Sequence, residues 1–160
     1  MAPTHLATTI RPFQPGDESA FRALNEEWIS KYFGMEDKDR VTLGDPVGQI
    51  LQPGGRIYIA LHGDEPIGCC ALIPMEPSAF ELAKMAVAER YRGQGVGRKL
   101  LEHVVEHAKA LGTRRLFLET NSKLDNAIHL YESVGFRHMP PERVTPSPYA
   151  RSNVSMEMWL

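Results

Sequence analysis

The stretch YRGQGVGRKL, residues 91–100, constrains this chain more than any other part of the sequence. It places Gly93, Gly95 and Gly97 directly before a segment with helical spacing of apolar residues. Glycine has no Cβ, so a ligand can come close to its backbone. The first N–H groups of a helix are unpaired and lie at the positive end of its dipole. A turn alone needs one glycine, so three of them predict an anion site, best suited to phosphate.

The segment after the glycines predicts an amphipathic helix from about Gly95 to Leu111. Its apolar positions recur every three or four residues and should face the core: Val96, Leu100, Leu101, Val104, Val105, Ala108 and Leu111. Gly112 follows as a C-cap. A second helix is predicted over LDNAIHLYESVG, residues 124–135, and it also closes on a glycine.

Strand-like segments come before, between and after these helices. We expect strands near residues 8–13, 56–61, 67–75, 79–87, 114–120, 136–139 and 153–160. Apolar residues at helical spacing predict a first helix that ends near Phe33, and DPVGQIL, residues 45–51, predicts a short one. This order predicts one α/β (or α+β) domain with a mixed sheet.

Composition limits the classes of function. The 160 residues fit one domain over residues 1–160, with residues 1–6 as a flexible tail. With 18 Lys and Arg against 20 Asp and Glu the net charge is −2, which argues against a nucleic-acid or anionic-membrane partner. The N-terminus lacks a signal-peptide pattern, and no apolar run approaches ~20 residues. We therefore expect a cytoplasmic protein, with Cys69 and Cys70 as reduced core thiols.

The glycine pattern distinguishes among phosphate ligands. The sequence does not contain the P-loop motif G-x-x-x-x-G-K-[ST]. It does not match the dinucleotide-binding motif G-x-G-x-x-G either, because Arg98 occupies the position of the third glycine. The pattern R-x-x-G-x-G, Arg92 to Gly97, resembles the acetyl-CoA-binding motif of the GCN5-related N-acetyltransferase (GNAT) superfamily. The resemblance extends over Ala79–Phe136 and includes NAIHLYESVGF, residues 126–136, which is similar to the family's second signature.

This resemblance implies a GNAT fold with a mixed, mostly antiparallel sheet that is splayed at the acetyl-CoA site and flanked by helices. It implies acetyl-CoA as co-substrate and no metal. The backbone of Met85 and Val87 would pair with the pantetheine amides, and Asn126 would contact the CoA arm. The loop would hold the pyrophosphate through Arg92, Gly93, Gln94, Gly95, Val96, Gly97 and Arg98.

Two residues are candidates for the chemistry. The resemblance places Tyr131 at the family's catalytic tyrosine, near the CoA sulfur, where a phenol can protonate the leaving thiolate. Glu81 looks like the glutamate that some relatives use as the base. It shares strand parity with Met85 and Val87 if no bulge intervenes, and a half-apolar strand would raise its pKa. A relayed water is the alternative base, and an exposed strand glutamate is the purely structural interpretation.

The predicted function is transfer of an acetyl group from acetyl-CoA to a primary amine of a small molecule or amino-acid-like acceptor. Acceptor contacts are expected from residues 25–40, which include Trp28 and Tyr32, from the region after Thr120, and from the segment that carries Tyr149 and Arg151. Core packing is the alternative for Trp28. Arg151 could hold a substrate carboxylate bidentately.

Other functions stay open at this stage. They are a protein lysine or N-terminal acetyltransferase, a non-catalytic acyl-CoA-binding module, and a nucleoside-triphosphate enzyme. A homodimer is compatible with the resemblance. HVVEH, residues 103–107, spells a zinc-peptidase pattern, but its histidines lie beside the core positions of the helix without a third-ligand motif, so we expect no metal there.

Overall fold

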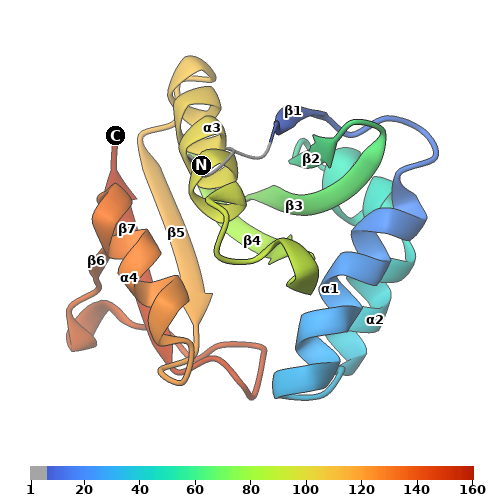
Figure 1. Ribbon diagram of the computed structural model, residues 1–160. Coiled ribbons are helices and arrows are strands. Elements are labelled where there is room, and N and C mark those ends of the chain that lie inside the picture. Colours follow the sequence, from blue (N-terminus) through green and yellow to red (C-terminus); the bar gives the residue numbers. More distant parts are fainter. Residues whose placement is uncertain (1–6) are drawn as a thin grey trace, which may run out of the picture.

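A seven-stranded sheet organises the computed structural model, which describes residues 7–160 (Figure 1). The predicted tail, residues 1–6, lies outside the described residues. The strand order is β1-β2-β3-β4-β5-β7-β6, and every neighbouring pair is antiparallel except β4 and β5. The strands are β1 (Thr9–Pro12), β2 (Arg56–His62), β3 (Glu65–Pro74), β4 (Ala79–Val87), β5 (Arg115–Thr120), β6 (Arg137–His138) and β7 (Val154–Trp159). The predicted mixed, mostly antiparallel sheet is confirmed.

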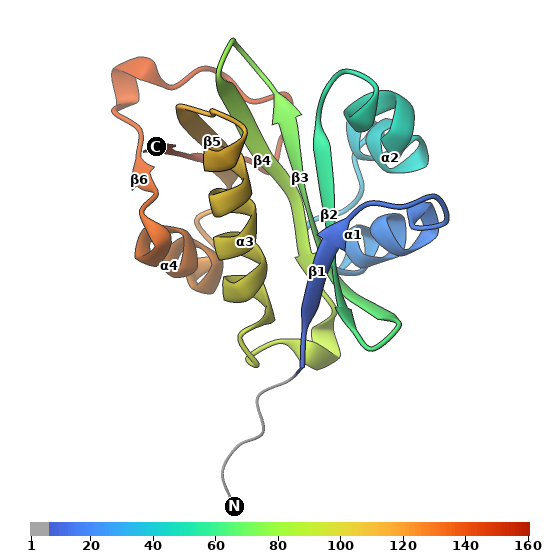
Figure 2. The same ribbon diagram turned by 90° about the horizontal axis from the view of Figure 1, so that it is seen from above.

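Helices cover both faces of the sheet. On one face lie α1 (Glu18–Tyr32) and α2 (Asp37–Gly44), and on the other lie α3 (Val96–Ala110) and α4 (Asp125–Val134), as Figure 2 shows from above. The short helical turns are a π-helix at Val47–Leu51 and 3₁₀ turns at Glu89–Tyr91 and Pro141–Arg143. No helix in the described part of the chain is both long and apolar enough to cross a membrane.

The region between α1 and β2 differs from the sequence prediction. Helix α2 was not predicted, because its apolar periodicity is weak and only Leu43 of its apolar residues is buried. A capping box starts it: the Glu36 side chain accepts from the backbone of Asp39, whose own side chain accepts from the Glu36 N–H at 3.0 Å. The helix predicted over residues 45–51 is a π-helical turn that begins after Pro46.

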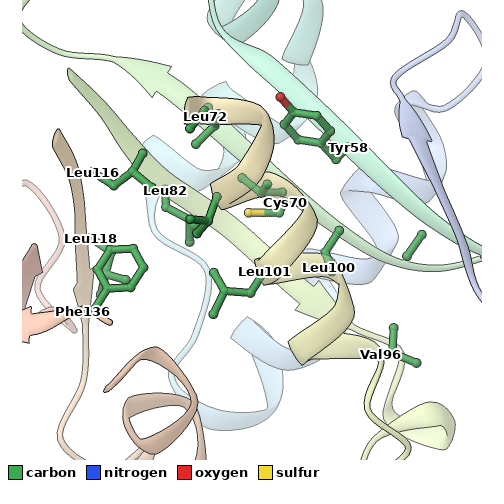
Figure 3. Packing of buried hydrophobic residues seen from close by; sticks show 14 of the residues in the cluster. Tyr58, Cys70, Leu72, Leu82, Val96, Leu100, Leu101, Leu116, Leu118 and Phe136 are labelled. Carbon is green, nitrogen blue, oxygen red and sulfur yellow. The ribbon is translucent and has the colours of Figure 1, made fainter. Parts of the chain in front are cut away.

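Two hydrophobic clusters form the core, one on each face. The cluster under α3 and α4 joins Tyr58, Leu100, Leu101 and Phe136, and Figure 3 shows them on several sides of α3. The cluster under α1 contains Phe21, Ile29 and Ile59. Cys70 belongs to the first cluster and Cys69 to the second; both are fully buried and free, as predicted.

Strands β4 and β5 pair over three residues and then separate. Ala79, Phe80 and Glu81 face Arg115, Leu116 and Phe117, and no pairing follows. The β5-facing edge of β4 beyond Glu81 therefore has no strand partner. This is the predicted splay of the sheet.

A β-bulge interrupts β4 immediately after the splay. Ala83 pairs with Ala71 and Ala86 with Cys69, so β4 holds one residue more than β3 over this stretch. Lys84 adopts a left-handed conformation there, with φ of 53°. The extra residue changes the side-chain alternation. The condition for Glu81 to share a face with Met85 and Val87, that no bulge intervenes, is therefore not met, and Glu81 lies on the opposite face.

Candidate active site

A cleft of about 1010 Å³ opens where β4 and β5 separate. Its walls are the ends of α1 and α2, the exposed edge of β4, the glycine loop, the end of β5, the start of α4 and the segment 148–152. The cleft brings together residues that are far apart in the sequence. The loop lies at one end of the lining, and α2 with residues 148–152 lies at the other.

The glycine loop has the geometry that an anion site requires. Gly93 and Gly95 both adopt left-handed backbone conformations, with φ of 76° and 82°. Apart from the glycine and its two neighbours in the chain, no protein atom lies within 4 Å of the position that a Cβ would take at either residue. Gly95 is the N-cap of α3, and no side chain caps this helix start. The amides of the first turn are therefore open to a ligand, and the residues present fit a diphosphate.

The other loop residues divide into two groups. Gly93, Gly95, Val96 and Gly97 line the cleft together with Arg92 and Arg98. The side chain of Gln94 does not line it, because its Nε2 donates to the carbonyl of Arg90 at 3.3 Å. Gln94 is thus the one residue of the predicted loop set, Arg92–Arg98, that is not among those lining the cleft.

The two arginines connect the loop to both sides of the cleft. Arg92 donates to the hydroxyl of Tyr32 in α1 at 3.3 Å. Arg98 donates to Oγ of Ser133 in α4 at 2.8 Å. Both guanidinium groups remain exposed, so positive charge flanks the loop.

Met85 and Val87 line the cleft from the α3 side of the sheet. A Cβ on Gly97 would be 3.7 Å from a methyl carbon of each of these side chains. Their side chains therefore pack under the first turn of α3, while the β4 edge that they belong to faces the separated β5. This arrangement fits the predicted backbone role of both residues.

Tyr131 lies on α4 and reaches the cleft beside the edge of Phe136, with ring centroids 6.0 Å apart. Among the described residues its hydroxyl has no hydrogen-bond partner. Burial raises its pKa well above the ordinary value, so the phenol keeps its proton. Asn126 is exposed in the first turn of the same helix and also lines the cleft.

Glu81 lines the cleft on the α2 side of the sheet and has no ion-pair partner in the described part of the chain. Burial raises its pKa to about 7, helped by the charge of Glu119 and opposed by Lys38 and Lys84. A carboxyl that titrates there can accept a proton near neutral pH. The expected rise of the Glu81 pKa is thus present, although its side chain lies on the other face from Met85.

Sequence reasoning missed two features of the cleft. Glu119 lies in β5, two residues beyond the partner of Glu81, and lines the cleft. The alternation of side chains along β5 could have predicted that Glu119 lies on the same face as Phe117. Buried Asp39 binds both Lys84 and Arg151. No sequence signal connects these three residues, because α2 was not predicted and the bulge reorients Lys84.

The expected role of Arg151 is not supported by its contacts. Its guanidinium donates to both carboxylate oxygens of Asp39 at 2.6 and 2.7 Å, and to Glu36 at 3.2 Å. The Arg151 guanidinium is therefore available to a substrate carboxylate only if Asp39 is displaced. The protein's own carboxylates occupy the guanidinium.

The contacts of Trp28 agree with both of its interpretations, core packing and a place in the cleft. It is half-buried against the α1 core cluster and packs edge-on against Phe33, and it also lines the cleft. Tyr32 is exposed at the cleft. On α3, His103 is exposed, and His107 contacts the hydroxyl of Tyr58. The described residues contain no group of three or more His, Cys, Asp or Glu side chains placed to hold a metal.

Comparisons with known proteins agree with this geometry. Residues 17–136 match the family model described as "Acetyltransferase (GNAT) family". An Escherichia coli protein described as the uncharacterized N-acetyltransferase YjgM is 32% identical over 119 residues, which cover 69% of this chain and 71% of that protein.

Solved structures share the fold over nearly the whole chain. A GNAT-family acetyltransferase from Staphylococcus aureus superposes with a TM-score of 0.84 at 21% identity, over 96% of this chain and 99% of that one. A Bacillus subtilis acetyltransferase in complex with CoA superposes with a TM-score of 0.72 at 22% identity, over 96% and 99% of the two chains. The chain therefore belongs to the GNAT acetyltransferase family and is an N-acetyltransferase.

Proposed function

We propose that the protein transfers an acetyl group from acetyl-CoA to a primary amine of a small molecule. The observation that carries this proposal is the cleft itself. An open glycine loop lies at one end of it, and Tyr131 and Glu81 reach it from opposite faces of the splayed strands. Such a cleft admits two substrates at the same time and brings their reacting groups together.

The loop end would hold the coenzyme. The amides of residues 93–97 would bind the pyrophosphate, with Arg92 and Arg98 adding positive charge. The unpaired edge of β4 at Met85 and Val87 would hydrogen-bond the pantetheine arm as an added strand does. Asn126 would contact the same arm from α4. In this arrangement the coenzyme supplies the activated thioester, and the protein supplies its placement.

Two side chains would move the protons. Glu81 accepts the proton that the attacking amine must lose, and its pKa of about 7 suits that role. A C–N bond forms as the C–S bond breaks, and the Tyr131 hydroxyl gives its proton to the departing sulfur. The raised pKa of Tyr131 keeps that proton available until thiolate charge develops. No covalent acetyl-protein intermediate is needed.

The charges in the cleft favour an amine acceptor without a carboxylate. Arg151 and Lys84 are paired with Asp39, whereas Glu81 and Glu119 have no hydrogen-bond or ion-pair partner among the described residues. An ammonium group can approach these two carboxylates favourably, and a substrate carboxylate that used Arg151 would have to displace Asp39, which leaves Lys38 as the other cation beside Tyr149. This argument favours simple amines over amino acids.

An acceptor screen tests the proposal. Purified protein is mixed with acetyl-CoA and a panel of alkylamines, arylalkylamines, amino acids and lysine peptides, and release of free CoA thiol is followed. We expect amine-dependent release, fastest with amines that lack a carboxylate. Tight CoA binding without release by any amine would favour the acyl-CoA-binding module. Release with lysine peptides alone would favour the protein acetyltransferase.

A further inference from the structure

The connection between β6 and β7 reaches across the molecule. It starts beside β5 and β7 and approaches α2 on the opposite side of the cleft, as the red-orange trace in Figure 1 shows. Pro148, Tyr149, Arg151 and Ser152 of this connection line the cleft. Residues 148–152 therefore form a wall that belongs in sequence to one half of the sheet and is held by the other half.

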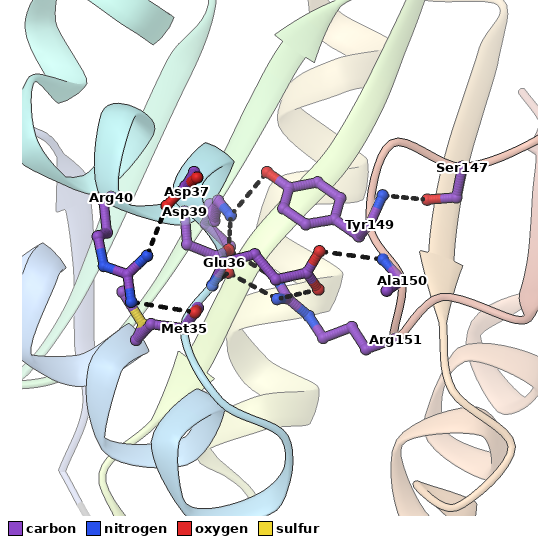
Figure 4. A network of polar contacts seen from close by, with 10 residues as sticks. Met35, Glu36, Asp37, Asp39, Arg40, Ser147, Tyr149, Ala150 and Arg151 are labelled. Carbon is purple, nitrogen blue, oxygen red and sulfur yellow. Dashed lines mark hydrogen bonds and ion pairs between the residues drawn. The ribbon is translucent and has the colours of Figure 1, made fainter.

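The side-chain contacts of Arg151 and the N–H of Ala150 tie this wall to α2 (Figure 4), while Asn121, directly after β5, donates to the Arg151 carbonyl at 2.6 Å. Arg151 binds both oxygens of Asp39 and one of Glu36, and the Ala150 N–H donates to Glu36 at 3.0 Å. Lys84, from the β4 bulge, donates to Asp39 at 2.8 Å and to the Tyr149 hydroxyl at 3.1 Å. We call Glu36, Asp39, Lys84, Tyr149 and Arg151 the Asp39 network.

The centre of this network is buried. The Asp39 side chain is 0% exposed, that of Lys84 is 6% exposed and that of Arg151 is 12% exposed. Burial acts to raise the pKa of Asp39, but hydrogen bonds from Arg151 and Lys84 outweigh it and hold that pKa well below its usual range. Because two cations share one buried carboxylate, Asp39 keeps a partner when either cation is removed.

The ring of Tyr149 is held by the two cations that bind Asp39 and by Lys38. Arg151, Lys84 and Lys38 lie 4.5, 4.7 and 5.6 Å from the centre of its ring, within the range of cation–π contacts. The hydroxyl is bound to Lys84, and the Tyr149 N–H donates to Oγ of Ser147 at 3.0 Å. The position of this aromatic ring in the cleft therefore depends on the network.

We propose that the Asp39 network determines acceptor specificity by holding residues 148–152 as a closed wall of the acceptor site. The proposal rests on the amine-acetylating function proposed above. While Arg151 stays bound to Asp39, the wall limits the width of the acceptor site. Release of Arg151 frees the wall and admits bulkier amines, and the glycine loop at the other end of the cleft is unaffected.

The test uses Arg151→Met, which removes the guanidinium and leaves the Asp39–Lys84 pair. Hydrogen exchange of residues 145–153 is measured by mass spectrometry, and kcat/KM is measured for primary amines of increasing bulk next to the amino group. We expect faster exchange in that segment. We also expect the bulky-to-small ratio of kcat/KM to rise by at least about tenfold, the scale of one methylene group in a tight pocket. The affinity for acetyl-CoA should not change.

Arg143→Met is the matched control. Arg143 lies in the same connection but binds Glu157 and does not line the cleft. Its loss should leave amine selectivity as in the wild type. If Arg151→Met does not fold, Arg151→Lys replaces it. Lysine keeps a positive charge opposite Asp39 but loses the bidentate contact. We therefore expect hydrogen exchange and amine selectivity to change in the same direction as in Arg151→Met, by a smaller amount.

The outcomes separate this inference from the proposed function. Faster exchange of residues 145–153 with unchanged amine selectivity would show that the wall does not select acceptors. Unchanged exchange would show that the network does not hold the wall; either result overturns the inference and leaves the acetyl transfer in place. A wild-type protein that acetylates no amine would remove the proposed function, and the inference with it.

Discussion

The two ends of the cleft are built in different ways. The proposed coenzyme end consists mainly of six consecutive residues, Arg92–Gly97, that present backbone amides at the start of α3. The proposed acceptor end consists of side chains from α2, β4 and the β6–β7 connection, where Asp39 and Arg151 are 112 residues apart. Backbone recognition can be encoded in one short segment, whereas side-chain recognition depends on how distant elements pack.

The comparison has a functional consequence. An end that binds through glycines and amides has few side chains to vary, so it suits a ligand that stays constant, such as a coenzyme. An end that binds through side chains of three elements can be altered at each of them, and here side chains from all three meet at the buried carboxylate of Asp39. We therefore expect substitutions at the two ends to affect different kinetic constants.

The largest effect should come from Gly95→Val. Gly95 is left-handed and its Cβ position is open, so valine both strains the turn and fills the space intended for the ligand. We expect the rise in melting temperature on addition of acetyl-CoA to disappear. Gly112→Val is the control, because Gly112 has φ of 81° and open space at the other end of α3. Both variants should lose about 1–2 kcal/mol of stability, and retained binding by Gly95→Val would contradict the loop assignment.

The next largest effect should come from Tyr131→Phe. Loss of the phenolic proton should lower kcat by about 100-fold, the scale of general acid catalysis. The Kd for acetyl-CoA should stay close to the wild-type value, since the ring is kept. Steady-state rates and calorimetric titration measure the two quantities. Tyr58→Phe removes a buried hydroxyl outside the cleft and serves as the control; equal rates in Tyr131→Phe and wild type would remove Tyr131 from the mechanism.

Substitutions of Glu81 and Glu119, which line the cleft, should change how activity depends on pH. If Glu81 must be deprotonated, activity rises with pH through about 7. Glu81→Gln should abolish that rising limb. Glu119→Gln should move it to lower pH, because the charge of Glu119 raises the Glu81 pKa. Rates measured from pH 5.5 to about 9 would show this, and a limb that survives in Glu81→Gln would point to a relayed water as the base.

The smallest effect concerns stability at high pH. The folded-state pKa of Glu81, about 7, lies above its ordinary value of 4.5, so between these two values the folded state binds more protons than the unfolded state. The free energy of unfolding therefore falls as pH rises from 4.5 to 7, because the unfolded state releases the Glu81 proton first. Glu81→Gln should gain about 1–3 kcal/mol over wild type at pH 8 and nothing near pH 4. Urea unfolding at both values measures it, and an equal gain at both would contradict the raised pKa.

Much of the fold could be predicted because its signals are local. Period-two and helical patterns located most strands and the two amphipathic helices α3 and α4, and left-handed glycines closed those helices as expected. Helix α2 could not be predicted, since it depends on a capping box and has a weak apolar pattern. The face of Glu81 could not be assigned either, because one extra residue at the β4 bulge reverses the alternation.

By itself the sequence determined the glycine loop and the helix that the loop begins, and it therefore predicts an anion site suited to a coenzyme. These depend on glycine's backbone freedom and on the unpaired amides of a helix start, which are properties of adjacent residues. Only the tertiary structure decided which charges in the cleft are free. Asp39 pairs with Lys84 and Arg151 because packing brings α2, the β4 bulge and the β6–β7 connection together and excludes water from the carboxylate. The same packing leaves Glu81 and Glu119 lining the cleft without an ion-pair partner among the described residues.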